Sequence, residues 1–282
     1  MTRVATVAYL GPPGTFTEEA VGRFDQCRDA HRVAYPTVAE VESAVRTGHA
    51  DAAVLALENS LAGSVLPTLD LLAFSSPLLI RAETILPITL VLAAAAGTRP
   101  AQVRRVLSHP HALDECAGFL GRHVPAAVRE PYASTAASMA AVRAGALAGE
   151  AGLAGVGPRG AALQHGLDIL ADDIADNPHN ATRFVLVGRT IGTPTGRDRT
   201  ALVCFQPADH PGSLLGILSV FADRGIDLLR LESRPARTTL GQYCFLFDCA
   251  GHVFDPPVWD AIRVLRGKGA QIRVLGSYPR AD

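Results

Sequence analysis

The chain has 282 residues, of which 48% are hydrophobic and 19% are charged, and its 26 basic side chains nearly balance its 27 acidic ones. This composition excludes a disordered chain, and the near-zero net charge gives no field to attract nucleic acid or an anionic membrane. A single hydrophobic core rarely grows past roughly 250 residues, so we expect two domains.

The apolar runs and the cysteines indicate a soluble cytoplasmic protein. The longest runs, such as "ITLVLAAAAG" from Ile88, are shorter than the roughly 20 residues of a membrane helix, and the N-terminal stretch lacks a signal peptide's hydrophobic segment. The five cysteines are odd in number without C-x-x-C spacing, which is typical of free thiols in a reducing compartment. Lys268 is the only lysine, so arginines and helix N-termini must bind any anion.

The first part of the chain alternates strands and helices. "RVATVAYLG" predicts a buried strand, and Thr15 with Glu18 forms a capping box for the helix that follows. Thr37 and Glu40 repeat the device between the extended "HRVAYPT" and the strand "ADAAVLALENS". Because such crossovers join parallel strands, we expect a parallel sheet.

The next part continues the alternation. "LLIRAETILPITLVLA" predicts long strand material, and three more strand-helix units follow it, so an α/β domain is expected. Residues 190–199, "TIGTPTGRDR", have the composition of a linker. Residues 200–282 then predict the order βαββαβ, the ferredoxin-like split.

Polar residues follow three of the predicted strands. Open α/β sheets bind their ligands at the carboxyl ends of strands, and helix N-termini attract anions. The three polar segments begin at Asn59, His109 and Ser134. Each of them, taken alone, can be explained as a turn or a helix cap. Taken together with Arg183 they favour an anion with more than one acidic group, bound by Asn59, Ser60, His109, Ser134 and Thr135.

The pair His109 and His111 resembles half of a metal site. Pro110 and the helix start direct the two rings differently, and no further ligands follow in order. We therefore predict that no metal binds there. Asp114 and Glu115 are interpreted as first-turn acids that the helix dipole favours.

The C-terminal part offers a second candidate site. Residues 212–214 begin a predicted helix, and residues 232–235 follow a predicted strand. The plain interpretation is an edge strand that stops at Pro235. The functional interpretation is an amino-acid pocket with backbone N–H groups for the carboxylate. The residues concerned are Gly212, Ser213, Leu214, Glu232, Ser233, Arg234 and Pro235.

Eight motifs in this order resemble one family. "YLGPPGTFTEEA", "ENSLAGSV", "ETILPI", "SHPHAL", "STAASMA", "NATRF", "PGSLLGIL" and "LESRP" are similar to monofunctional prephenate dehydratase with a C-terminal ACT regulatory domain. The resemblance implies a catalytic domain, residues 1–189, of two lobes like those of periplasmic binding proteins. Lobe one would comprise residues 1 to about 80 and 178–189, lobe two residues 81–177, and the ACT domain residues 200–282.

The resemblance also implies the activity. Prephenate would lose carbon dioxide and water to give phenylpyruvate, on the route to phenylalanine, without a cofactor or metal. Thr182 would be the essential residue, which we interpret as a hydrogen-bond donor to the leaving hydroxyl. Arg183 would bind a substrate carboxylate, and Phe184 would keep the pocket apolar. The source of the proton for the leaving hydroxyl stays open.

Regulation follows from the same resemblance. L-phenylalanine would bind between two ACT domains, through the seven residues of the second candidate site, which requires a homo-dimer or homo-tetramer. Two alternatives stay open: an arogenate dehydratase, and a non-catalytic sensor or solute-binding protein. The intact T-R-F motif and the missing export signal argue against the sensor.

Overall fold

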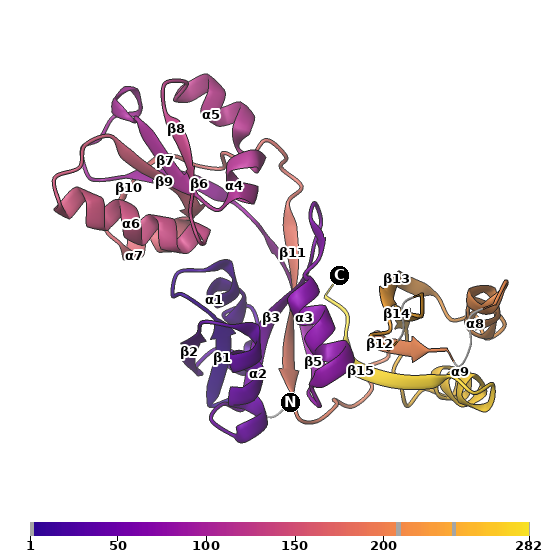
Figure 1. Ribbon diagram of the computed structural model, residues 1–282. Coiled ribbons are helices and arrows are strands. Elements are labelled where there is room, and N and C mark those ends of the chain that lie inside the picture. The colour runs from indigo at the N-terminus through magenta and orange to yellow at the C-terminus, as the bar shows by residue number, and fades with distance from the viewer. Residues whose placement is uncertain (1–2, 207–209, 239–240, 282) are drawn as a thin grey trace.

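The computed structural model describes residues 3–206, 210–238 and 241–281, which form two lobes and a C-terminal domain (Figure 1). The elements of the first lobe are β1 (Thr6–Leu10), α1 (Phe16–Val21), the 3-10 turn η1 (Asp25–Cys27), β2 (His31–Tyr35), α2 (Val38–Thr47), β3 (Ala52–Asn59), β4 (Gly63–Ser64), α3 (Leu66–Asp70), the π-helical turn η2 (Leu71–Ser75), β5 (Leu79–Pro87) and β11 (Ala181–Gly188).

The elements of the second lobe are β6 (Leu90–Ala94), the 3-10 turn η3 (Pro100–Gln102), β7 (Arg105–Ser108), α4 (Pro110–Glu115), α5 (Ala117–His123), β8 (Val128–Pro131), α6 (Thr135–Leu147), β9 (Leu153–Pro158), α7 (Arg159–Gln164) and β10 (Asp168–Ala171). The elements of the C-terminal domain are β12 (Asp198–Phe205), α8 (Ser213–Ala222), β13 (Leu228–Pro235), β14 (Tyr243–Ala250), α9 (Pro256–Gly267) and β15 (Gln271–Pro279).

The predicted caps and parallel pairing are confirmed in the first lobe. Thr15 Oγ1 accepts a hydrogen bond from the backbone N–H of Glu18, and Thr37 Oγ1 accepts one from that of Glu40. Strand β1 pairs in parallel with β2 on one side and β3 on the other. The chain returns in β11, which runs antiparallel between β3 and β5.

The long strand material predicted over residues 78–93 is divided between two strands. The first of these strands, β5, belongs to the first sheet. The next, β6, belongs to a second sheet, which has five strands in the order β10-β6-β9-β7-β8. Pro87 ends β5, and the N–H of Ile88 donates to Asn180 O, 2.8 Å away on the second connection between the lobes. The first lobe therefore extends through Pro87, not to about residue 80, because β5 pairs with β11 along its whole length.

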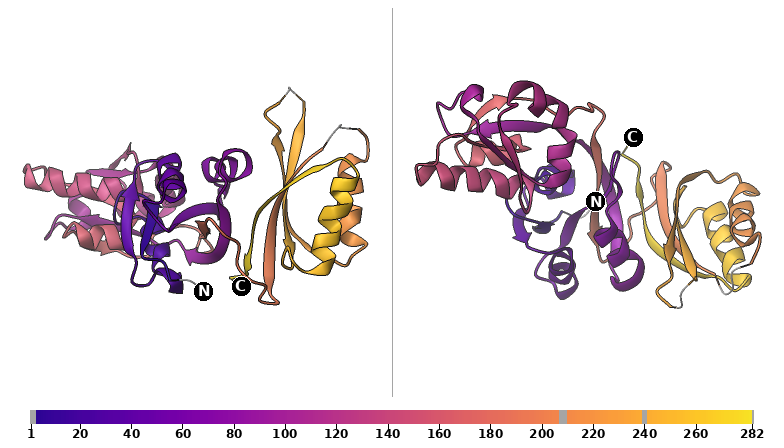
Figure 2. Two further views of the ribbon diagram at one scale, coloured as in Figure 1. Left: turned by 90° about the horizontal axis from the view of Figure 1, so that it is seen from below. Right: turned by 45° about the horizontal axis from the view of Figure 1, so that its top comes forward.

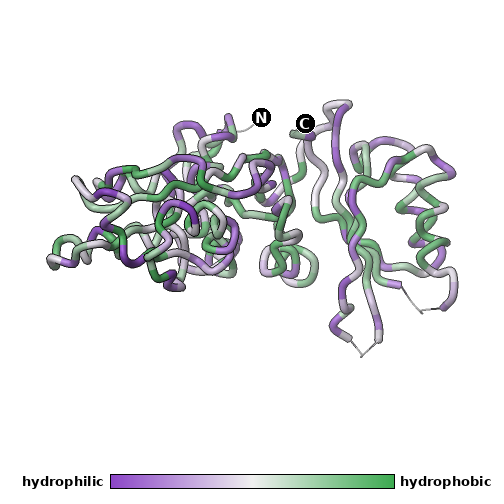
Figure 3. Tube along the Cα trace, turned by 90° about the horizontal axis from the view of Figure 1, so that it is seen from above, coloured by the Kyte–Doolittle hydropathy of each residue, from purple (hydrophilic) through white to green (hydrophobic). Residues whose placement is uncertain are grey.

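The predicted order βαββαβ is confirmed in the C-terminal domain. Its strands, ordered β13-β14-β12-β15, continue the first sheet through β15 and β5. Helices α8 and α9 cover the face that points away from the first lobe (Figure 2). Apolar segments run along the strands and these two helices (Figure 3).

One glycine permits this continuous sheet. Gly276 is the residue of β15 that pairs with Ile80 of β5. A Cβ at Gly276 would lie 2.3 Å from Ile80 O. The face of the C-terminal sheet that α8 and α9 leave uncovered packs on the first lobe, where Ala201 and Val203 share a core cluster with Leu69.

No helix within the described parts of the chain has the length and apolar character needed to cross a membrane.

Candidate active site

A cleft of about 300 Å³ lies between the two lobes, beside the two connections that join them. Phe16 at its wall packs against the cores of both lobes. The lining residues are Thr15, Phe16, Thr17, Ala56, Asn59, Ala62, Val65, Ile88, Leu90, His109, His111, Ala112, Glu115, Thr135, Asn180, Thr182 and Phe184. Most are apolar or carry a neutral hydrogen-bonding group, and this set contains no arginine and no lysine.

The hydroxyl of Thr182 has a defined direction of hydrogen bonding. Asn59 lies opposite Thr182 in the β3–β11 register. Its Oδ1 accepts from the backbone N–H groups of Leu61 and Ala62, at 2.9 and 2.8 Å, so its Nδ2 must be the donor on the other side. That Nδ2 donates to Thr182 Oγ1 over 3.0 Å. Thr182 therefore accepts from Asn59 and keeps its own hydrogen for an acceptor in the cleft.

A chain of hydrogen bonds continues from Asn59 into the second lobe. Asn59 Nδ2 also donates to Asn180 Oδ1 over 2.7 Å, and Asn180 Nδ2 donates to Glu115 Oε1 over 3.0 Å. His111 Nε2 lies 3.1 Å from the same Glu115 oxygen. Burial raises the pKa of Glu115 above the ordinary value of a glutamate, against the opposing influence of His111 and Asn180.

The second lobe brings a helix N-terminus to the cleft. Thr135 is the first residue of α6, and the preceding Ser134 caps the helix by accepting from the backbone N–H of Ala137. Gly157 of β9 lets the helix approach the sheet, because a Cβ there would lie 2.5 Å from Thr135 O. The N-terminal end of a 13-residue helix thus faces the cleft, where its dipole favours an anion.

The predicted substrate-binding residues divide into two groups. Asn59, His109 and Thr135 line the cleft. Ser134 is outside the lining and acts as a helix cap. Ser60 is also outside it, because its hydroxyl donates to His179 O and accepts from the N–H of Ala181, which fastens the start of β11 to β3.

Arg183 points away from the cleft, although Thr182 and Phe184 line it. Successive side chains of a strand alternate between its faces, so Arg183 emerges on the opposite side. There its Nη2 donates to Glu58 Oε2 over 2.7 Å. The expected contact of Arg183 with a substrate carboxylate therefore does not fit this geometry.

A buried charge cluster receives Arg183 at the junction with the C-terminal domain. Its Nη1 donates to Glu83 Oε2 over 3.2 Å and to Asp248 Oδ2 over 3.0 Å. Asp248 also accepts from Arg199 over 3.2 Å. Burial lowers the pKa of Arg183, but the carboxylate of Asp248 and its neighbours more than offset this, so the group stays charged. Burial, with Asp248 nearby, raises the pKa of Tyr278 well above its ordinary value.

Part of the predicted effector site is assembled in the C-terminal domain. Gly212 and Ser213 line a hollow of about 280 Å³ together with Lys268. The neighbouring Leu214 is half-buried and is not among the lining residues. Ser233 lines a separate hollow on β13 and β14.

Glu232 and Arg234 of the predicted effector segment face the first lobe. Glu232 Oε2 accepts from Ser64 Oγ over 2.5 Å, and Arg234 Nη2 donates to both oxygens of Asp70 over 2.9 Å. Pro235 is the last residue of β13. In one copy of the chain, Glu232 and Arg234 therefore contact the first lobe, not the hollow at Gly212.

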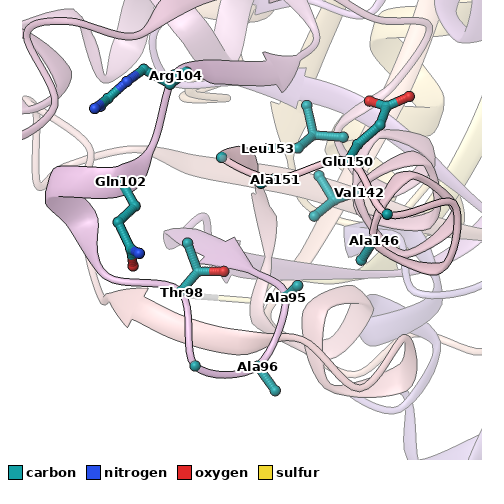
Figure 4. Close-up of a pocket in the computed structure, with 13 residues that line it drawn as sticks. Ala95, Ala96, Thr98, Gln102, Arg104, Val142, Ala146, Glu150, Ala151 and Leu153 are labelled. Carbon is teal, nitrogen blue, oxygen red and sulfur yellow. The ribbon is translucent and has the colours of Figure 1, made fainter.

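Another hollow, of about 380 Å³, lies at the far edge of the second lobe (Figure 4). It is lined by loop residues before β7 and β9 and by the last turns of α6, such as Val142 and Ala146. These are the opposite ends of the elements that reach the cleft. Arg104 and Glu150 are its charged lining residues. The cleft between the lobes is therefore the candidate site.

Sequence reasoning missed several cleft residues. The sequence places Thr15, Phe16 and Thr17 at a helix start, but they also line the cleft, and their position after a parallel strand is the same signal that indicates Asn59. Glu115 was interpreted as a first-turn acid, but it is the last residue of the short helix α4. Asn180 had no local signal, because its partners are distant in sequence.

The fold and the cleft define a class: a two-lobed α/β protein of the periplasmic-binding-protein-like kind, fused to a βαββαβ domain. The sequence model described as Prephenate dehydratase matches residues 7–191. The chain belongs to the prephenate dehydratase family. It is accordingly an enzyme of the hydro-lyase class.

Individual relatives agree with this assignment. A prephenate dehydratase of Mycolicibacterium vanbaalenii is 41% identical over 291 residues, which cover 98% of this chain and 91% of the relative. The crystal structure of prephenate dehydratase from Arthrobacter aurescens in complex with L-Phe is 41% identical, with a TM-score of 0.89, over 99% of this chain and 91% of that one. A solved structure described as GqqA, a novel type of quorum quenching acylase, is 30% identical, with a TM-score of 0.86, over 98% of each chain.

Proposed function

We propose that the chain converts prephenate to phenylpyruvate, carbon dioxide and water, and that Thr182 donates a hydrogen bond to the departing hydroxyl. The observation that carries this role is the Asn59 amide, which is held by two backbone N–H groups and donates to Thr182 Oγ1. The threonine hydrogen is thereby left for the cleft. A donor aimed at developing negative charge acts mainly on the transition state.

The remaining lining suits the other half of the reaction. Prephenate carries two carboxylates, and the N-terminal end of α6 at Thr135, with His109, offers donors for an anion. Phe16, Ile88 and Phe184 make the rest of the cleft apolar. A carboxylate that leaves as neutral carbon dioxide loses its charge, so poor solvation of that carboxylate favours its departure. No group in this scheme requires a cofactor.

We propose further that the C-terminal domain is an ACT domain through which L-phenylalanine regulates the enzyme. The L-Phe complex of the Arthrobacter aurescens relative supports this effector. The hollow at Gly212 and Ser213 is the candidate contact. The buried cluster at Arg183 supplies a physical route, because Arg183 follows Thr182 directly while Asp248 belongs to the C-terminal domain.

We propose a homo-dimer or homo-tetramer. Strand β13 is one edge of the first sheet, and Leu231 on it is 44% exposed. Leu215 on the adjacent α8 is 67% exposed. An unpaired edge strand offers its backbone N–H and C=O groups for pairing with a second copy, and the two exposed leucines would be covered there. The five free, buried cysteines support a reducing, cytoplasmic setting.

Turnover assays test the function. Prephenate and arogenate are supplied in parallel, phenylpyruvate is followed by ultraviolet absorbance and phenylalanine by amino-acid analysis, each with and without added L-phenylalanine. Prephenate turnover that L-phenylalanine alters is the expected result. Turnover of arogenate alone would make the chain an arogenate dehydratase, and binding of either compound without turnover would make it a sensor.

A matched pair of variants tests the role of Thr182. Thr182→Val keeps the shape and removes the donor, and we expect kcat to fall by about 100- to 1,000-fold. Thr98→Val makes the same change at the hollow on the far edge of the second lobe and should leave kcat unchanged. Near-normal turnover by Thr182→Val would refute the assignment.

A further inference from the structure

The reaction consumes one proton, and its source has to be found in or beside the cleft. When the bond between the ring and its carboxylate breaks, the electron pair moves through the ring and expels the hydroxyl as hydroxide. Hydroxide becomes water only if it receives a proton. A threonine hydroxyl is too weak an acid to give up its proton outright, so Thr182 can donate a hydrogen bond but needs an acid beside it.

We propose that Glu115 is the acid that protonates the departing hydroxyl, and that His111 returns a proton to Glu115 from solvent. This inference rests on the proposed prephenate dehydration. Among the described residues that line the cleft, Glu115, His109 and His111 are the groups able to exchange a proton near neutral pH. Of these, Glu115 is the one joined to Thr182, through Asn180 and Asn59.

The two partners differ in solvent access in the way a proton relay requires. The side chain of Glu115 is 11% exposed, whereas that of His111, one turn earlier on α4, is 50% exposed. His111 Nε2 lies 3.1 Å from Glu115 Oε1, within hydrogen-bonding distance. Glu115 is therefore the acid held inside the cleft, and His111 is the base in contact with solvent.

The surroundings of Glu115 favour its protonated form. Its pKa is raised by burial, which disfavours the carboxylate. The part of the cleft lining that comes from the first lobe carries no charged side chain. From the segment before β11, the backbone N–H of Asp176 donates to Glu115 O, and the Asp176 carboxylate accepts from the backbone N–H groups of Gly118 and Phe119. His109 is the remaining titratable group of the lining.

The proton steps then balance. Glu115 transfers its proton to the leaving oxygen while Thr182 keeps its own and donates a hydrogen bond to the same oxygen. Carbon dioxide, water and phenylpyruvate leave, and Glu115 remains as a carboxylate. Protonated His111 passes a proton to Glu115 Oε1, and solvent restores the proton on His111.

The test compares pH profiles of kcat for the full chain and its variants. The parent should lose activity as the pH rises through the pKa of Glu115, because the acid must be protonated. Glu115→Gln should lower kcat at least 100-fold and abolish that limb of the profile. Glu115→Ala should regain activity when formate or acetate is added. Asp114→Asn, at the exposed neighbouring position, is the control and should match the parent.

Each result decides between acid catalysis and a structural role. Equal kcat and an unchanged pH profile in Glu115→Gln would overturn the proposal, and so would a lower kcat whose pH limb persists and which small acids do not restore. His111→Asn should lower kcat less than Glu115→Gln does, and added imidazole should raise its kcat. If the Glu115 variants fold poorly, this variant still tests the relay, because a kcat equal to that of the parent would overturn the role of His111. If the parent itself forms no phenylpyruvate, the proposed function fails and not this inference.

Discussion

Replacing Asp248 by asparagine tests whether the buried charge cluster at Arg183 holds the C-terminal domain on the first lobe. Asp248 Oδ2 accepts from Arg183 over 3.0 Å and from Arg199 over 3.2 Å. The three side chains are 4%, 7% and 15% exposed. Asparagine has the same shape but no charge, so the two arginines lose one carboxylate that water cannot replace.

The expected loss in the free energy of unfolding follows from the number of carboxylate partners that the two arginines lose and keep. Removing one partner of a buried ion pair costs about 3 to 5 kcal/mol. The asparagine oxygen still accepts one hydrogen bond, and Arg183 keeps Glu58 and Glu83, so we expect the lower end of this range. A loss of about 3 kcal/mol changes the unfolding equilibrium roughly 100-fold.

The single tryptophan reports on this domain. Trp259 lies on α9, so its fluorescence during urea unfolding follows the C-terminal domain. Asp260→Asn is the control, because Asp260 also pairs with two arginines, Arg224 and Arg263, but at the surface. Its effect should be much smaller, since water solvates the freed groups. A free energy of unfolding for Asp248→Asn within about 0.5 kcal/mol of the parent would refute the reasoning.

Three further predictions concern close contacts and thiols. Gly157→Ala should displace the start of α6 and lower kcat/KM for prephenate about 100-fold, while Gly160→Ala, which meets nothing within 4 Å, should not; equal kinetics for both would contradict the placement of the helix. Gly276→Ala forces a Cβ against Ile80 O and should lower the free energy of unfolding by about 1 to 3 kcal/mol in the Trp259 assay, so an unchanged value would argue against the β15–β5 junction. Thiol reagents should modify the native chain slowly at pH 8 and the unfolded chain quickly, because burial raises the pKa of Cys27 to about 11 and of Cys116 to about 12; fast native labelling would contradict this burial. Since these folded pKa values exceed the unfolded one, stability should fall as the pH rises above about 9.

The sequence by itself determined most of the elements and several residues that line the cleft from both lobes. Local patterns set the capped helix starts at Thr15 and Thr37 and the order βαββαβ near the C-terminus, because hydrophobic period and capping act over a few residues. Strand ends indicated Asn59, His109 and Thr135, which do line the cleft. The motif "NATRF" also indicated Thr182 and Phe184, and both line the same cleft.

The tertiary structure decided which residues contact Arg183 on the face of β11 away from the cleft and which residue contacts Asn180 from the second lobe. Alternation along β11 already requires Arg183 to face away from Thr182. Only the fold shows that this opposite face meets Asp248, a carboxylate 65 residues later, and not a substrate. In the same way, Asn180 and Glu115 are 65 residues apart yet share a hydrogen bond in the cleft. Partners at such separations leave no local pattern, because packing of the lobes and the C-terminal domain brings them together.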